Sequence, residues 1–172
     1  SKDYLIEMIV ENVIHKCIIQ PIYNEYYIEL LCEIYKDSPK LNKLIGEKSE
    51  YFYKNIMENN IDKNQSEYLQ YCDKNKHLDL LIGYSLLITE LEKNKILTNR
   101  INPSLISLLD ELKNNDDTDE KYKCIHCLYN IFKSYYEDLL LPQGYIDKLN
   151  ELIKNEKSTK IKFKLMDIVE RK

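Results

Sequence analysis

Apolar residues recur along the chain at the three-to-four-residue spacing of amphipathic helices, and no segment shows the alternation typical of a β-strand. A helix is predicted over residues 4–19, before Pro21, and another between Pro21 and Tyr35. The remaining predicted helical segments are 41–57, 67–73, 78–91, 103–112, 121–136, 142–153 and 158–172. The segment 78–91 is apolar on more than one face, which predicts a central, buried helix. The pattern therefore predicts an all-α protein of eight or nine helices.

Several helix ends are marked by capping residues or proline. Pro21 ends the first helix and fixes a tight turn before the second, which predicts a helical hairpin. Asn102 and Pro103 have the residue types of an N-cap and a first helical position. Asp117 and Glu120 have the spacing of a capping box, so a helix is expected to begin directly after Asp117. The polar stretch 58–65 predicts a loop.

The last predicted helix, 158–172, reads STKIKFKLMDIVERK and follows Ser158 as N-cap. An apolar stripe on it is predicted to pack in the core, with Phe163 and Met166 widening the stripe; its residues are Ile161, Leu165, Ile168 and Val169. Because an α-helix turns by about 100° per residue, three cations of this helix lie within roughly 40° of one another around its axis. They are Lys160, Lys164 and Arg171, called the basic ridge below. The ridge is expected to face solvent or a partner.

Composition narrows the class of protein. With 172 residues, the chain has the length of about one domain, and its net charge of −4 argues against a protein that coats nucleic acid. No membrane-length apolar run or secretory leader is present, so we expect a cytosolic or nuclear protein. The five cysteines are an odd number and lie among apolar residues, which predicts reduced core thiols. The abundance of Ile, Lys, Asn and Tyr is typical of an AT-rich genome, such as that of a protist or a large DNA virus.

Catalytic and metal chemistry are disfavoured. Cys124, His126 and Cys127 stand together, but no second ligand pair has zinc-site spacing, and the CxxC lies mid-helix with no preceding strand. There is no glycine-rich phosphate loop and no nucleophile elbow. We therefore expect no enzyme, no metal and no cofactor. Tyr23, Tyr26 and Tyr145 are candidates for stacking on RNA bases, although aromatic residues in helical hairpins are more often core.

Three stretches of the chain carry motifs of a known family. In 158–172 the matching residues are Lys160, Ile161, Lys162, Phe163, Leu165, Asp167 and Ile168. In 82–98, IGYSLLITELEKNKILT, they are Gly83, Ile88, Glu90, Leu91, Lys93, Lys95, Leu97 and Thr98. In 13–35 they are Lys16, Ile18, Pro21, Tyr23 and Tyr27. In this order the stretches resemble the MIF4G domain, the middle domain of translation initiation factor 4G.

The resemblance implies an α-solenoid of antiparallel helix pairs of the HEAT-repeat type. It covers residues 1–172 as a single domain whose first repeat lacks its first helix. Pro103 departs from the family, which is helical from the position of Thr98, and predicts a shortened or kinked helix there. The implied function is that of a monomeric, non-catalytic scaffold in translation initiation, in the cytoplasm, or the host cytoplasm if the chain is viral.

The implied partner is a DEAD-box RNA helicase of the initiation factor 4A type, held by both RecA-like lobes so that its cycle is stimulated. The residues assigned to helicase binding are Gln20, Pro21, Tyr23, Asn24, Leu87, Glu92, Lys93, Lys160, Lys164 and Arg171. The residues of the basic ridge are also assigned to RNA binding. Glu92 departs from a family phenylalanine, which puts a contact carried by that aromatic residue in doubt. Motifs for cap-binding protein are expected outside these residues.

Two alternatives remain at this point. One is a MIF4G scaffold of the nuclear cap-binding, splicing or mRNA-decay machinery. The other is a viral helical bundle that binds host signalling or apoptosis proteins through a groove. An extended, curved solenoid would exclude the bundle. An RNA-binding domain proper would show steep salt dependence, and the acidic net charge counts against it.

Overall fold

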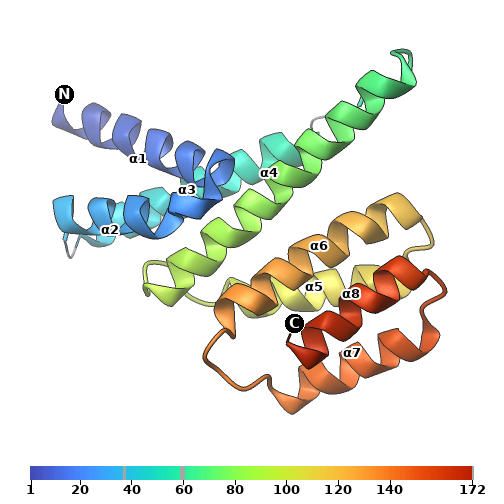
Figure 1. Ribbon diagram of the computed structural model, residues 1–172. Coiled ribbons are helices and arrows are strands. Elements are labelled where there is room, and N and C mark those ends of the chain that lie inside the picture. Colours follow the sequence, from blue (N-terminus) through green and yellow to red (C-terminus); the bar gives the residue numbers. More distant parts are fainter. Residues whose placement is uncertain (37, 59–60, 172) are drawn as a thin grey trace. The chain divides into compact units, whose positions relative to one another are not determined.

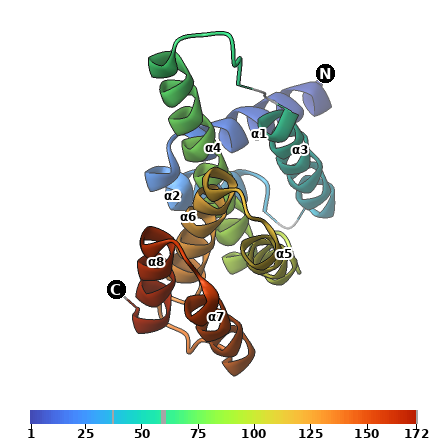
Figure 2. The same cartoon turned by 90° about the vertical axis from the view of Figure 1, so that its right-hand side faces the viewer.

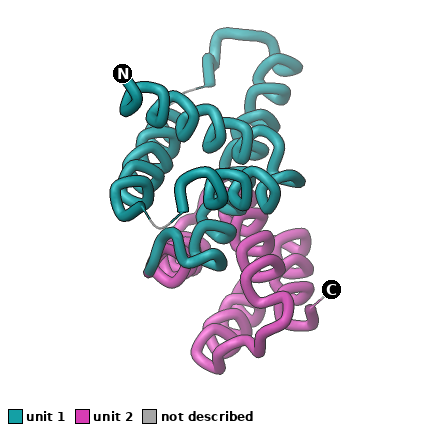
Figure 3. Tube along the Cα trace, turned by 90° about the vertical axis from the view of Figure 1, so that its left-hand side faces the viewer, with its two compact units in different colours: residues 1–98 teal, residues 99–172 magenta. Residues whose placement is uncertain are grey.

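The computed structural model describes residues 1–36, 38–58 and 61–171, and over these residues the chain forms α-helices, one 3-10 turn and no strand. The predicted all-α class is confirmed. The helices divide into two compact units, Ser1–Thr98 and Asn99–Lys172, coloured separately in Figure 3. The expectation of one continuous repeat domain stays a prediction.

The first unit is built on one long helix. It contains α1 (Lys2–Ile19), the 3-10 turn η1 (Pro21–Tyr23), α2 (Asn24–Ile34), α3 (Pro39–Glu58) and α4 (Glu67–Lys93). α1, α2 and α3 all pack against α4 (Figure 2). The predicted segments 67–73 and 78–91 are therefore one helix of 27 residues, because the polar stretch between them stays helical. Pro21 ends α1 as predicted, and its fixed φ suits the first position of η1. The predicted loop 58–65 includes residues 59 and 60, which lie outside the described residues.

Gly83 sets the distance between α1 and α4. A Cβ atom at this position would lie 2.0 Å from the backbone oxygen of Ile18, far inside van der Waals contact. Only glycine allows the two helix backbones to approach this closely. The contact closes a core that contains Val10, Ile14, Cys17, Ile28, Leu31, Leu87 and Leu91.

The second unit consists of two helical hairpins. The first pairs α5 (Ile101–Asn114) with α6 (Thr118–Tyr135), and the second pairs α7 (Gln143–Asn155) with α8 (Thr159–Glu170). The hairpins lie side by side, α6 against α8 and α5 against α7 (Figure 1). The predicted N-caps Asp117 and Ser158 are confirmed, since the Asp117 side chain accepts from the amides of Asp119 and Glu120 and the Ser158 hydroxyl accepts from Ile161. These caps fix where the two helices that carry the candidate site begin.

Two sequence predictions in the second unit, for Asn102 and for Phe163, are wrong, and of the two interpretations of Tyr145 the core one is confirmed. Asn102 is not an N-cap: α5 begins at Ile101, two residues before the predicted start at Pro103, and the Asn102 side-chain oxygen accepts a hydrogen bond from the Tyr145 hydroxyl instead. Pro103 accordingly lies in the first turn of α5, where a missing N–H costs nothing. Tyr145 is buried, so it is not a stacking platform. Phe163 does not widen the core stripe of α8, because its side chain is 59% exposed while Ile161, Leu165 and Ile168 are buried.

Candidate functional site

Three tyrosines form a row along the side of α6 that meets α8. Tyr122, Tyr129 and Tyr136, the tyrosine row, are seven residues apart, which is about two helical turns and returns each ring to the same side of the helix. All three are half-buried. The row therefore offers α8 a regular series of aromatic rings.

The lysines of the basic ridge lie on these rings. The Nζ of Lys160 is 4.2 Å from the centroid of the Tyr122 ring, and the Nζ of Lys164 is 3.7 Å from that of Tyr129. Each cation–π contact contributes about 0.5–1 kcal/mol where it remains solvated. Lys160 and Arg171 are exposed, so the expectation that the ridge faces solvent or a partner is confirmed for these two residues, while Lys164 is half-buried. The two contacts favour positions of the ammonium groups over the rings.

Arg171 reaches the same side of α6 by a different route. It is the C-cap of α8 in the left-handed conformation, with φ 59° and ψ 47°, so the helical angle expected for it does not apply. Its guanidinium donates to the backbone oxygen of Tyr136, at 3.1 Å, and to that of Leu139. These carbonyls belong to the end of α6 and the loop after it, where unpaired carbonyl groups attract a cation. The basic ridge is thus anchored along α6 from Tyr122 to Tyr136.

His126 lies within this cationic surface. Its ring is 4.3 Å from the Tyr122 ring in an edge-on arrangement. Burial, and then the charges of Lys164 and Lys160, lower the pKa of His126. The imidazole is therefore neutral at neutral pH and adds no charge to the ridge.

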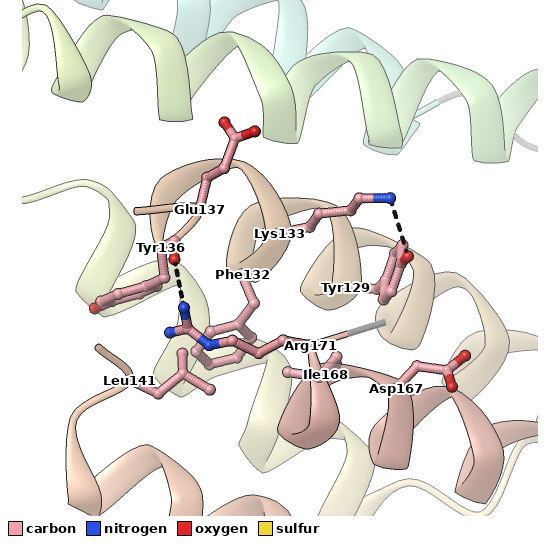
Figure 4. Close-up of a pocket in the computed structure, with 9 residues that line it drawn as sticks. All are labelled: Tyr129, Phe132, Lys133, Tyr136, Glu137, Leu141, Asp167, Ile168 and Arg171. Atoms are coloured by element: carbon pink, nitrogen blue, oxygen red, sulfur yellow. Dashed lines mark hydrogen bonds between the residues drawn. The ribbon is translucent and has the colours of Figure 1, made fainter. Parts of the chain in front are cut away.

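A pocket of about 190 Å³ opens where α6, α8 and the loop after α6 meet (Figure 4). Its lining residues are Tyr129, Phe132, Lys133, Tyr136, Glu137, Leu141, Asp167, Ile168 and Arg171. Lys133 donates to the Tyr129 hydroxyl at 3.3 Å and lies 5.5 Å from the centroid of that ring. The tyrosine row, the ridge and the pocket thus share residues and form one continuous candidate site.

The residues assigned to the first-hairpin turn lie in the other unit. Pro21 and Tyr23 form η1, and Tyr23 is half exposed. The Gln20 side chain accepts a hydrogen bond from the Tyr27 hydroxyl at 2.8 Å. Asn24 is 4% exposed, and neither polar atom of its side chain has a hydrogen-bond partner in the protein. Of these four assigned residues Tyr23 has the most accessible side chain, and its neighbour Ile22 is also exposed.

The remaining assigned residues lie along and at the end of α4. Leu87 is fully buried in the core of the first unit, so its side chain contributes packing and is not accessible to a partner. Glu92 is half-buried, and Lys93 is exposed in the last turn. Tyr26, the other exposed candidate for stacking, is 66% exposed on α2.

The cysteines are all free. Cys17 and Cys127 are buried, and burial raises the pKa of Cys17 and of Cys124 to about 12. Thiols with such values are protonated and unreactive at neutral pH. Among the described residues, no group of three or more His, Cys, Asp or Glu side chains is arranged to hold a metal ion. In the same part of the chain, no helix combines the length and apolarity that crossing a membrane requires.

Comparison with known proteins gives no match to a family model, a curated protein or a solved structure. The likeness to the MIF4G domain therefore rests on the three sequence stretches. Sequence reasoning missed the tyrosine row, Lys133 and the pocket. The seven-residue spacing of the tyrosines was the available signal, because residues two turns apart on a helix share a side.

Proposed function

We propose that the chain is a non-catalytic scaffold domain of the MIF4G type that binds a DEAD-box RNA helicase of the initiation factor 4A type. The observation that carries the proposal is the basic ridge on the tyrosine row. Lys160 and Lys164, where the resemblance implies contact with a helicase, are held 4.2 and 3.7 Å from ring centroids. A cation held in place before binding loses less conformational entropy when a partner docks.

The packing of the second unit supports the repeat part of the proposal. Its two hairpins stack with α6 against α8 and α5 against α7, as successive repeats of a solenoid do. Gly83, on which the resemblance partly rests, is required by the close approach of α1 and α4. A residue needed for helix packing supports a shared fold more strongly than a surface match does.

The proposed mechanism is a shift of the helicase between conformations. One RecA-like lobe binds near Tyr23 of the first unit, and the other binds the basic ridge. A scaffold that contacts both lobes favours the arrangements in which both contacts are made, and it accelerates turnover only through that difference in affinity. The scaffold supplies no catalytic group.

ATP turnover of the helicase tests this mechanism. The RNA-dependent ATPase rate is measured with the helicase alone, with the wild-type chain, and with the variant Lys160→Glu, Lys164→Glu, Arg171→Glu. The matched control is Lys148→Glu, Lys154→Glu, Lys157→Glu, which makes the same charge change at exposed lysines of α7 and the following loop. We expect the wild type and the control to raise the rate and the ridge variant to lose most of that effect. An unchanged rate with all three would exclude the mechanism.

A further inference from the structure

The pocket of Figure 4 has an apolar floor. Phe132 and Ile168 are buried at its base, and the half-buried Leu141 closes it from the loop after α6. Tyr129 and Tyr136 form its walls. Such a floor gains free energy by burying another apolar group, at about 25 cal/mol per Å² removed from water.

The size of the pocket restricts what it can hold. Its volume is about 190 Å³. Sites for cofactors and drug-sized molecules occupy about 300–1,000 Å³, so this pocket is too small for a nucleotide or a similar ligand. One bulky side chain, such as that of leucine or phenylalanine, is the class of group that fits.

The charges around the pocket favour an acidic neighbour for that side chain. Lys133 and Arg171 line the pocket together with Glu137 and Asp167. The pocket lining thus has two charges of each sign, and the ridge lysines Lys160 and Lys164 add two cations farther along the tyrosine row. Arg171 donates two of the five N–H groups of its guanidinium to backbone oxygens. The remaining donors suit a carboxylate.

The loop after α6 exposes apolar surface next to the pocket. Leu139 is 54% exposed and Leu140 is 92% exposed, and Arg171 holds the backbone of Leu139. Apolar side chains grouped beside a pocket are typical of protein-binding surfaces. RNA is less suited, because ammonium groups already cover one face of the rings of Tyr122 and Tyr129, on which bases would stack.

We propose that this pocket binds a bulky apolar side chain carried on an acidic segment of a partner protein. This inference rests on one part of the proposed function, namely that the second unit contacts a partner protein. It identifies the kind of peptide segment that enters the site: one apolar anchor with carboxylates on both sides, which meet Lys133 and Arg171.

A probe peptide tests the inference on the full chain. The probe has one phenylalanine between two runs of three glutamates, and the control peptides replace the phenylalanine with serine or the glutamates with lysine. Binding is followed by the NMR shifts of the methyl groups of Leu141 and Ile168. We expect saturable shifts with the probe and none with either control peptide. Absence of shifts with the probe, or displacement of the probe by a ten-nucleotide oligouridine, would overturn the proposal.

Two variants separate the contributions of the floor and the rim. Leu141→Asp and Lys133→Glu are each expected to weaken probe binding by at least roughly tenfold, as loss of a binding hot spot does. Lys133 is exposed, so its variant keeps the test valid if Leu141→Asp unfolds the protein. Lys148→Glu is the control and is expected to bind as the wild type does. Equal probe affinity of the wild type and Lys133→Glu would contradict the proposal.

Titration of the helicase with the same variants distinguishes failure of this inference from failure of the proposed function. If the helicase binds the wild type and both pocket variants equally, the pocket inference fails and the scaffold function stands. If the probe peptide binds and the helicase does not, the helicase assignment fails and the pocket inference stands.

Discussion

The ammonium group of Lys164 lies 3.7 Å from the centroid of the Tyr129 ring, on the neighbouring helix. The contact joins α8 to α6 and fixes a charge at their shared surface. Lys160 makes the equivalent contact with Tyr122 one helical turn earlier on α8. The structural role and the proposed binding role of these lysines therefore depend on the same geometry.

The titration of His126 reports on this geometry. Burial, followed by Lys164 and Lys160, lowers the pKa of His126 below its ordinary value of 6.5. Lys164→Gln removes one of these charges, so we expect the pKa of His126 to rise toward 6.5, measured by NMR titration of the imidazole proton. A Lys148→Gln control is expected to leave it unchanged. An unchanged value in Lys164→Gln would mean that this lysine does not face the imidazole.

The same shift has a consequence for stability. Because the folded-state pKa of His126 is lowered, the unfolded chain binds the proton first as pH falls. The contribution of His126 to stability is therefore complete above its pKa in the unfolded chain, about 6.5, and decreases as pH falls below that value. We expect His126→Gln to reduce the slope of unfolding free energy against pH below about pH 6.5, measured by urea denaturation. An unaltered slope would contradict the assignment.

The ion pair between Lys121 and Glu156 ties the α7–α8 loop to α6. The two charged atoms are 2.7 Å apart, and the side chain of Glu156 is 5% exposed. Burial opposes ionisation of Glu156, but hydrogen bonds from Lys121 and from the Ser158 amide outweigh it and lower its pKa. Lys121→Met is expected to cost about 3 kcal/mol at pH 7, because it leaves a buried carboxylate without its cation.

The pH dependence of that variant provides the check. In the wild type, folding lowers the pKa of Glu156. The ionised carboxylate therefore stabilises the protein fully at pH values above its pKa in the unfolded chain. This stabilisation is lost as pH falls through its pKa in the folded protein. The difference between wild type and Lys121→Met should therefore shrink below pH ~4, in urea denaturation at several pH values. Lys113→Met breaks the exposed pair with Glu151 and should cost at most about 1 kcal/mol. Equal losses in the two variants would contradict the account.

Gly83 offers a test of the packing in the first unit. Gly83→Ala would place a Cβ 2.0 Å from the Ile18 backbone oxygen, so α1 and α4 must separate. We expect a loss of about 3 kcal/mol, despite the better helix propensity of alanine. Gly144 in α7 has open space where a Cβ would lie, so Gly144→Ala should gain about 0.5–1 kcal/mol. Urea denaturation of both variants gives the comparison, and a Gly83→Ala protein as stable as wild type would refute the packing argument.

Local rules predicted the features that depend on neighbouring residues. The caps at Asp117 and Ser158, the helix end at Pro21 and the buried stripe through Ile161 and Leu165 follow from side-chain chemistry and helical spacing. The continuity of α4 did not follow, because its polar middle has no apolar periodicity of its own and is helical as part of a longer element.

The candidate site depends on relations between helices, which spacing within one helix does not contain. Angular position placed Lys160 and Lys164 together, but their lean toward Tyr122 and Tyr129 results from the packing of α8 on α6. The predicted angular position of Arg171 on the helix was wrong because Arg171 is itself the left-handed C-cap of α8. Asn102 was misassigned because its partner, Tyr145, is distant in sequence.

Calorimetric titration of the full chain with an initiation factor 4A-type helicase tests the central claim most directly. We predict saturable one-to-one binding by the wild type and by the Lys148→Glu, Lys154→Glu, Lys157→Glu control. Much weaker binding is expected from Lys160→Glu, Lys164→Glu, Arg171→Glu, with circular dichroism showing that this variant stays helical. Absence of binding by the wild-type chain would contradict the claim and favour another MIF4G-type scaffold or a groove-binding helical bundle.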